Sequence, residues 1–266
     1  MITSFKCGGL AVGFTWAHLI GDIPSGAACF SKWAQLVSGK KPTTPTLRDP
    51  LAVPPSTPLV SVAAPPSVKA TAAPVGDHWT VPATRDMEPF SFHVTEQQLE
   101  GLQLGADAGH RQVGPFELVA ALMWRALAAI RGFGEEATRT VTVVKAAGGG
   151  GVAGVAELAA LLAGGASLDD EAGAAAAWAA AAGADAVVYG ANLTFVDAGE
   201  VDVYGGLELA GRRPAHVEYA VGGVGDGGAA VVHRDAGGRG RSVAAVVRRG
   251  EADHLRDSLR DALRAA

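Results

Sequence analysis

Cysteine is scarce in this chain of 266 residues, which contains only two. Cys7 lies in a run with strand character, and Cys29 lies in a run with helix character. Isolated cysteines of this kind are usually small buried hydrophobic residues. We therefore expect both side chains to be buried, in a protein that belongs to a reducing compartment such as the cytoplasm.

Long blocks of one charge sign are also missing. The 27 acidic and 22 basic residues give a formal net charge of −5 and are spread along the whole sequence. Proteins that bind nucleic acids or anionic lipid usually concentrate basic residues in one region. The charge pattern therefore argues against a nucleic-acid partner.

No segment has the composition of a signal peptide or a membrane span. The first residues lack the basic-then-apolar order of a signal peptide. The most apolar tract, residues 172–188, is built mainly of alanine and is interrupted by Gly183 and Asp185. A span needs about 20 strongly apolar residues. We expect a helix followed by a strand here, and no transmembrane segment.

Patterns typical of metal sites, covalent nucleophiles and phosphate loops are absent as well. Cys7 and Ser25 have no base partner at an informative spacing. The four glycines at 148–151 are not followed by Gly-Lys-Ser/Thr, so they indicate a flexible linker. Six histidines are scattered singly, which predicts no metal site: His78, His93, His110, His216, His233 and His254.

Large residues at alternate positions predict a strand from Leu10 to Trp16 with one buried face. His18 has the same parity and is expected at the inner end of this strand. A break follows at residues 21–24. We expect Ser25 to cap a helix that ends at Ser38-Gly39.

Proline marks the boundary between two parts of the chain. Eleven of the 14 prolines lie between Pro42 and Pro89. This density argues against regular structure and predicts a linker. We therefore divide the chain into a first domain at 1–41, a Pro-rich crossover at 42–90 and a second domain at 91–266.

Local signals in the second domain predict mixed α and β structure. Residues 95–98 form a capping box ahead of a short helix, and Pro115 begins a well-buried helix that ends before Gly132. Residues 138–145 are rich in β-forming residues, and 152–182 predict two alanine-rich helices. Short strands are expected at 192–196, 217–221, 229–233 and 242–247. A final amphipathic helix carries Leu255, Leu259 and Leu263 on one face.

One pentad carries candidate chemistry. Residues 18–22 read His-Leu-Ile-Gly-Asp, an H-x-x-x-D pattern that is weak alone. It follows Lys-Cys-Gly-Gly at 6–9 and precedes Trp-Ala-Gln-Leu at 33–36, while residues 115–126 read Pro-Phe-Glu-Leu-Val-Ala-Ala-Leu-Met-Trp-Arg-Ala. In this order and spacing the chain resembles the BAHD family of plant acyl-CoA-dependent acyltransferases, with an N-terminally truncated first domain.

The resemblance implies an α/β (α+β) fold of two acyltransferase-like domains with mixed sheets, the first incomplete. It also implies transfer of an acyl group from acyl-CoA, a co-substrate and not a bound cofactor, to a small-molecule alcohol or amine acceptor. His18 would be the base, because a neutral imidazole can accept the acceptor's proton. Asp22 would have a structural role through a basic partner, at the position of Lys145.

Further residues resemble the wax-biosynthesis branch of the family, the Eceriferum-2 and Glossy-2 type. Residues 202–206 read Asp-Val-Tyr-Gly-Gly where the family has Asp-Phe-Gly-Trp-Gly, so only the first and last residues agree. The flanking segments at 190–197 and 223–226 resemble the wax branch, as does Ile23, which follows the pentad in place of glycine. The branch implies a role in cuticular wax and very-long-chain fatty-acid metabolism. Two alternatives stay open: a non-catalytic partner of a fatty-acid condensing enzyme, peripheral at the endoplasmic reticulum, or an inactive truncated copy.

Overall fold

The computed structural model describes residues 1–17, 21–42, 69–70, 83, 85–106, 113–132, 141–144, 186–187, 190–209 and 211–265. The chain folds into two compact units, and neither is continuous in sequence. The first contains Met1–Leu47 and Val201–Val217, and the second contains Arg48–Glu200 and Glu218–Ala266. Residues 201–217 thus belong with the N-terminal part, although the sequence suggested one second domain from residue 91 onward.

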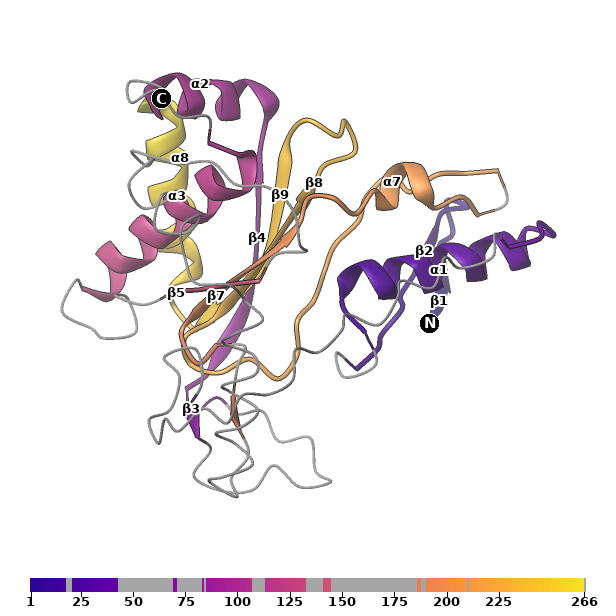
Figure 1. Cartoon of the computed structure of the whole chain (residues 1–266), viewed down its shortest axis with the longest axis horizontal. Coiled ribbons are helices and arrows are strands. Elements are labelled where there is room, and N and C mark those ends of the chain that lie inside the picture. The colour runs from indigo at the N-terminus through magenta and orange to yellow at the C-terminus, as the bar shows by residue number, and fades with distance from the viewer. Residues whose placement is uncertain are drawn as a thin grey trace, which may run out of the picture. The chain divides into compact units, whose positions relative to one another are not determined.

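The first unit combines a β-hairpin with two helices (Figure 1). Strands β1 (Ile2–Ser4) and β2 (Leu10–Val12) pair antiparallel. Helix α1 (Ile23–Val37) follows, and the short helix α7 (Val203–Gly206) packs against it.

The expected strand from Leu10 to Trp16 is shorter than the alternating pattern predicts. It ends at Val12, and Leu10 and Phe14 are 59% and 41% exposed. Alternation identifies which side chains share a face, but burial requires another layer to cover that face. In the described residues of the hairpin, no side chain is fully buried.

Both cysteines are exposed, which contradicts the expectation that they are buried. Cys7 lies in the turn between β1 and β2, and Cys29 lies on an exposed face of α1. Whether a cysteine is buried depends on which face of its turn or helix it occupies, and composition alone does not predict that face.

The second unit is built on a five-stranded mixed sheet in the order β4-β9-β8-β7-β5. Its strands are β4 (Met87–Val94), β5 (Val141–Val144), β7 (Leu193–Ala198), β8 (Ala229–Arg234) and β9 (Arg241–Arg248). Strand β9 pairs antiparallel with β4 and β8, while β7 pairs parallel with β5 and β8. The α/β architecture with a mixed sheet is therefore confirmed.

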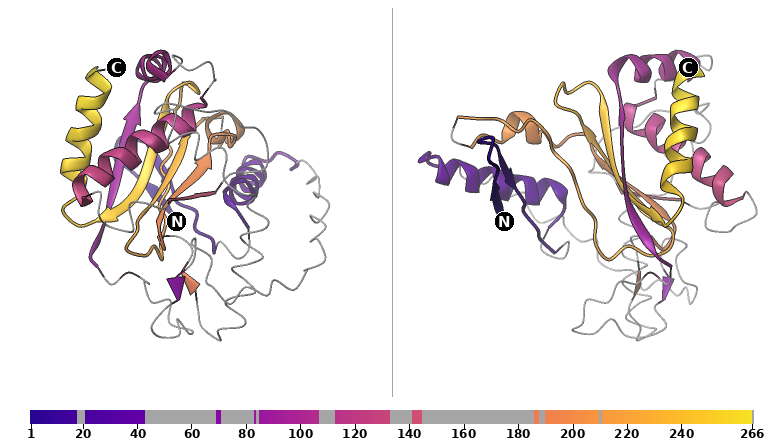
Figure 2. Two further views of the ribbon diagram at one scale, coloured as in Figure 1. Left: turned by 60° about the vertical axis from the view of Figure 1, so that its left-hand side comes forward. Right: turned by 180° about the vertical axis from the view of Figure 1, so that it is seen from behind.

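Helices α3 (Pro115–Arg131) and α8 (Ala252–Ala265) pack together on one side of this sheet, and α2 (Glu96–Ala106) lies beside them (Figures 1 and 2). The hydrophobic core forms between the helices and the sheet. Its most buried side chains include Leu118, Leu122, Met123, Leu127, Phe195, Val232, Val247 and Leu255.

Several local predictions for the second unit are confirmed. The hydroxyl of Thr95 accepts from the backbone N–H of Gln98 at 3.3 Å. In return the side-chain oxygen Oε1 of Gln98 accepts from the backbone N–H of Thr95 at 2.9 Å. This is the reciprocal pattern of a capping box.

The other two helices also follow their predicted bounds and faces. Helix α3 begins at Pro115 and ends before Gly132, whose φ of 85° suits only glycine. Helix α8 buries Leu255, Leu259 and Leu263, the three leucines of its predicted apolar face.

Two predictions for this part of the chain are wrong. Residues 217–221 form no strand. The Pro-rich region contains regular structure: β3 (Lys69–Ala70), which pairs with β6 (Ala186–Val187), and the first half of β4. Pro89 is accommodated because β4 is an edge strand of the sheet, where one side of the backbone pairs with no other strand among the residues that the structure describes. The predicted alanine-rich helices at 152–182 lie outside the described residues.

Candidate active site at the start of helix α1

The H-x-x-x-D pentad lies between strand β2 and helix α1. Its histidine, His18, and the two residues after it lie outside the described residues, so the role of His18 stays a prediction. Gly21 and Asp22 are described, and they form the entry to α1. The site is therefore built from the residues on either side of residues 18–20.

Asp22 is the N-cap of α1, a position that the sequence assigned to Ser25. Its backbone is extended, with φ −73° and ψ 178°. The carboxylate oxygen Oδ1 accepts from the backbone N–H of Ser25 at 2.9 Å and from the Ser25 hydroxyl at 2.5 Å. Pro24 lies in the first turn and has no N–H to donate. The carboxylate therefore accepts from the next backbone N–H, that of Ser25.

The predicted structural role of Asp22 thus has a visible local basis. Its side chain bonds the first turn of the helix, and its own carbonyl accepts from the N–H of Gly26 at 3.0 Å. Both bonds require Asp22 to keep one backbone conformation. Lys145, the expected basic partner, lies outside the described residues, so that pairing stays a prediction.

Aromatic side chains line this entry to the helix. Phe14 stacks on Trp16 with ring centroids 5.7 Å apart and on Phe30 at 5.5 Å, and Phe30 stacks on Trp33 at 5.5 Å. The indole N–H of Trp16 donates to the carbonyl of Gly21 at 3.0 Å. A row of four rings therefore connects the segment before the pentad to the body of α1.

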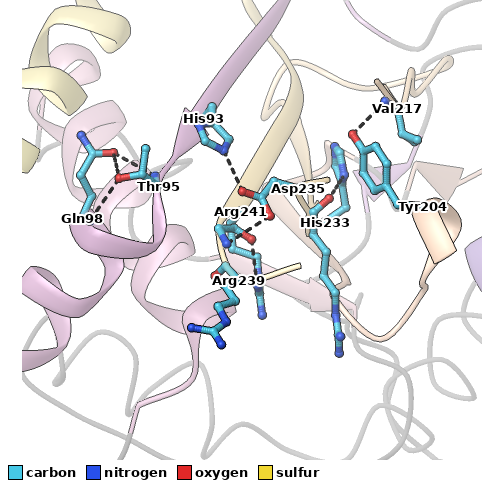
Figure 3. Close-up of polar contacts among 11 residues, drawn as sticks. His93, Thr95, Gln98, Tyr204, Val217, His233, Asp235, Arg239 and Arg241 are labelled. Carbon is cyan, nitrogen blue, oxygen red and sulfur yellow. Dashed lines mark hydrogen bonds and ion pairs between the residues drawn. The ribbon is translucent and has the colours of Figure 1, made fainter. Parts of the chain in front are cut away.

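Residues 201–217 contact the middle of α1 and the residues just after its end, which sequence analysis did not predict. The hydroxyl of Ser31 donates to the carbonyl of Gly206 at 2.7 Å, and Lys40 Nζ contacts Glu208 Oε1 at 2.6 Å. Within this segment Asp202 caps α7 by accepting from the N–H of Gly205. The Tyr204 hydroxyl accepts from the N–H of Val217 at 2.9 Å (Figure 3). The counterpart of the family's Asp-Phe-Gly-Trp-Gly motif thus supports the helix that Asp22 begins.

The second unit has a polar cluster at the carboxyl ends of β4 and β8. His93 Nε2 lies 3.1 Å from Asp235 Oδ2, and Asp235 Oδ1 accepts from the N–H of Gly240 (Figure 3). Burial and the nearby charge of Arg234 lower the pKa of Arg241. His93, which the sequence showed as isolated, is therefore paired with a carboxylate 142 residues away.

The described residues contain neither a cluster of metal-ligating side chains nor a helix that could span a membrane. Within the described ranges, no group of three or more His, Cys, Asp or Glu side chains is arranged to hold a metal ion. Among the helices that the structure describes, none is both long and apolar enough to cross a bilayer. The pentad and its surroundings remain the candidate active site.

Comparisons with known proteins place this site in a family. Residues 1–147, which include the pentad and all of α3, match the family described as the Transferase family. Two solved structures of TRI101, from F. sporotrichioides in complex with coenzyme A and T-2 and from F. graminearum without ligand, have TM-scores of 0.49 and 0.47. They are 13% and 12% identical, and each alignment covers 92% of this chain and 62% of the other.

Curated relatives are more similar in sequence. Protein ECERIFERUM 26-like of Arabidopsis thaliana is 33% identical over 87% of this chain, and Protein ECERIFERUM 2 of the same plant is 31% identical over 87%. The chain spans 57% of the length of each. A hydroxycinnamoyltransferase of Narcissus pseudonarcissus is 30% identical over 51% of this chain and 32% of its own length. The chain belongs to the transferase family of BAHD acyltransferases, whose members include these plant proteins.

Proposed function

We propose that the protein transfers an acyl group from acyl-CoA to a hydroxyl or amine acceptor, within very-long-chain fatty-acid and cuticular wax metabolism. Membership of the transferase family and similarity to the ECERIFERUM proteins support this assignment. The observation that carries it is the arrangement of Asp22. Its carboxylate is used to cap α1, which leaves His18 as the pentad's candidate for proton transfer.

In this proposal His18 is the general base. Its neutral imidazole accepts the proton of the acceptor hydroxyl or amine as that atom attacks the thioester carbonyl. The carbon–sulfur bond then breaks, and the CoA sulfur leaves with the proton that His18 returns. Asp22 transfers no proton, because its role is to fix the helix start beside His18.

The second candidate is a non-catalytic partner of a fatty-acid condensing enzyme, acting at the surface of the endoplasmic reticulum. One observation favours it. The alignments with ECERIFERUM proteins cover 87% of the chain, against 51% for the hydroxycinnamoyltransferase.

One pair of assays separates the candidates. The protein and its His18→Ala variant are compared for turnover of acyl-CoA with a panel of alcohols and amines. The same two proteins are co-expressed with a condensing enzyme, and the chain lengths of the fatty acids are measured. Turnover that His18→Ala abolishes supports the acyltransferase. A chain-length change that His18→Ala leaves intact, without turnover, supports the partner role and contradicts the acyltransferase.

A further inference from the structure

Trp16 reaches across the pentad to its far side. The indole Nε1–H donates to the backbone carbonyl of Gly21, five residues later, at 3.0 Å. This hydrogen bond joins the residue two before His18 to the residue just before Asp22. The bond links two partly buried residues of the same unit and so fixes the distance between the Trp16 ring and Gly21.

The ring of Trp16 also rests against the first turns of α1. A methyl group added at Gly26 would lie 2.5 to 2.8 Å from three atoms of the indole's six-membered ring, Cζ2, Cε2 and Cη2. Such distances are too short for carbon atoms in contact. Gly26 is buried and its backbone needs no glycine for conformational reasons. Its missing side chain is therefore what makes room for the indole.

Trp16 consequently contacts the residue before Asp22 and the residue four positions after it. Between these contacts lie the two bonds that hold Asp22 at the N-cap: its carboxylate accepts from the N–H of Ser25, and its backbone carbonyl accepts from the N–H of Gly26. Only tryptophan has both the flat ring that fills the space over Gly26 and an N–H at its edge that can donate to Gly21. Phenylalanine could keep part of the packing but would lose the donor.

We propose that Trp16 is a positioning residue for the aspartate end of the pentad: it holds Gly21 by its indole N–H and α1 by its ring, and so sets where Gly21 and Asp22 lie. The expected effect of Trp16 on activity rests on the proposed function. The positioning itself does not depend on that function, because the contacts of Trp16 can be measured in a protein that turns over no substrate.

The first test is Trp16→Phe, with Trp33→Phe as the matched control. Trp33 is the last ring in the same aromatic row and lies within α1, eight residues after Ser25. Loss of one hydrogen bond should raise the open population of the helix start roughly 2- to 12-fold. Amide hydrogen exchange at Ser25 and Gly26 should accelerate by this factor in Trp16→Phe and stay unchanged in Trp33→Phe. Equal exchange rates in both variants would overturn the proposal.

Gly26→Ala supplies an independent test that keeps the indole N–H. The added methyl group should displace the ring and accelerate the same two amides. In the double variant Trp16→Phe/Gly26→Ala the outer atoms of the indole, Cζ2 and Cη2, are absent and the smaller phenyl ring reaches less far over residue 26. The alanine should therefore add little beyond Trp16→Phe alone. Additive effects of the two changes would contradict the packing contact. Should Trp16→Phe not fold, Gly26→Ala alone decides: unchanged exchange at Ser25 and Gly26 would sink the proposal.

Activity then distinguishes positioning from simple stabilisation. Trp16→Phe should lower kcat with KM unchanged, because the pentad is positioned less precisely, while Trp33→Phe should leave kcat unchanged. If Trp16→Phe lowers the melting temperature but leaves kcat unchanged, Trp16 stabilises the fold and does not position the pentad. If the parent protein has neither turnover nor a chain-length effect, the proposed function fails, and the exchange measurements still test the contacts of Trp16.

Discussion

Arg131 and Glu251 form a buried ion pair with two parallel hydrogen bonds. Arg131 Nε donates to Glu251 Oε1, and Arg131 Nη2 donates to Glu251 Oε2, each at 2.7 Å. The two side chains are 1% and 9% exposed. Arg131 Nη1 also donates to the carbonyl of Gly227 at 2.9 Å. The pair thus joins the end of α3 to the turn before α8 and to the loop before β8.

We predict that Glu251→Gln destabilises the second unit by about 3–5 kcal/mol, because the change leaves the Arg131 charge buried without a counter-charge. Urea unfolding measures this effect through the free energy of unfolding. The control is Asp253→Asn, which removes the exposed pair with Arg256. That change should cost at most about 0.5 kcal/mol. A loss of less than about 1 kcal/mol for Glu251→Gln would show that the pair is not a major source of stability.

Asp22→Ala should lower the free energy of unfolding by about 0.5–2 kcal/mol, since the carboxylate that caps α1 is lost. Asp22→Asn should stay close to the parent, because an asparagine side-chain oxygen caps helices about as well. Chemical denaturation of the parent and both variants tests the order. If Asp22→Asn is as unstable as Asp22→Ala, the negative charge matters more than the cap, as it would with the basic partner predicted at Lys145.

The Lys40–Glu208 contact should stabilise the first unit only while Glu208 is ionised. The hydrogen bond from Lys40 and its positive charge lower the pKa of Glu208 below its ordinary value. A carboxyl group whose pKa is lower in the folded state contributes stability above its unfolded pKa and loses it as the pH falls through its folded pKa.

Glu208→Gln should therefore lower the melting temperature slightly at pH 7 and have no effect below the folded pKa of Glu208. Both groups are exposed, so about 1 M salt should also remove the difference by screening. Thermal melts of parent and variant across pH and salt measure this. A difference that persists at low pH would assign the effect to packing and not to charge.

Gly190→Ala should destabilise the second unit more than Gly238→Ala does. Both glycines have positive φ, 80° and 79°, so the backbone strain of alanine is the same at each. A methyl group at Gly190 would meet the backbone of Gly225 at 2.5 Å, whereas nothing lies within 4 Å at Gly238. We expect a further loss of about 1–3 kcal/mol at Gly190, measured by denaturant unfolding. Equal losses would mean that the loop around Gly225 yields freely.

Features that depend on neighbours in sequence were predictable. The capping box at Thr95 and Gln98, the start of α3 at Pro115 and the leucine face of α8 all follow from hydrogen bonds or spacings within a few residues. The same holds for the recognition of the pentad and of the family. Where the signal was local but two residues competed, the choice was wrong: Asp22, and not Ser25, caps α1.

Contacts between distant parts of the chain were decided by the tertiary structure. The support of α1 by residues 201–217, the pairing of β4 with β9 and the ion pair of Arg131 with Glu251 each join segments more than 100 residues apart. No periodicity in sequence encodes such a partner, because it is chosen by which surfaces remain to be covered once the helices and strands have formed. The sequence alone determined the local elements and the family, whereas tertiary packing decided that β4 lies at a sheet edge, where Pro89 is tolerated, and that the Trp16 ring packs over Gly26 at the start of α1.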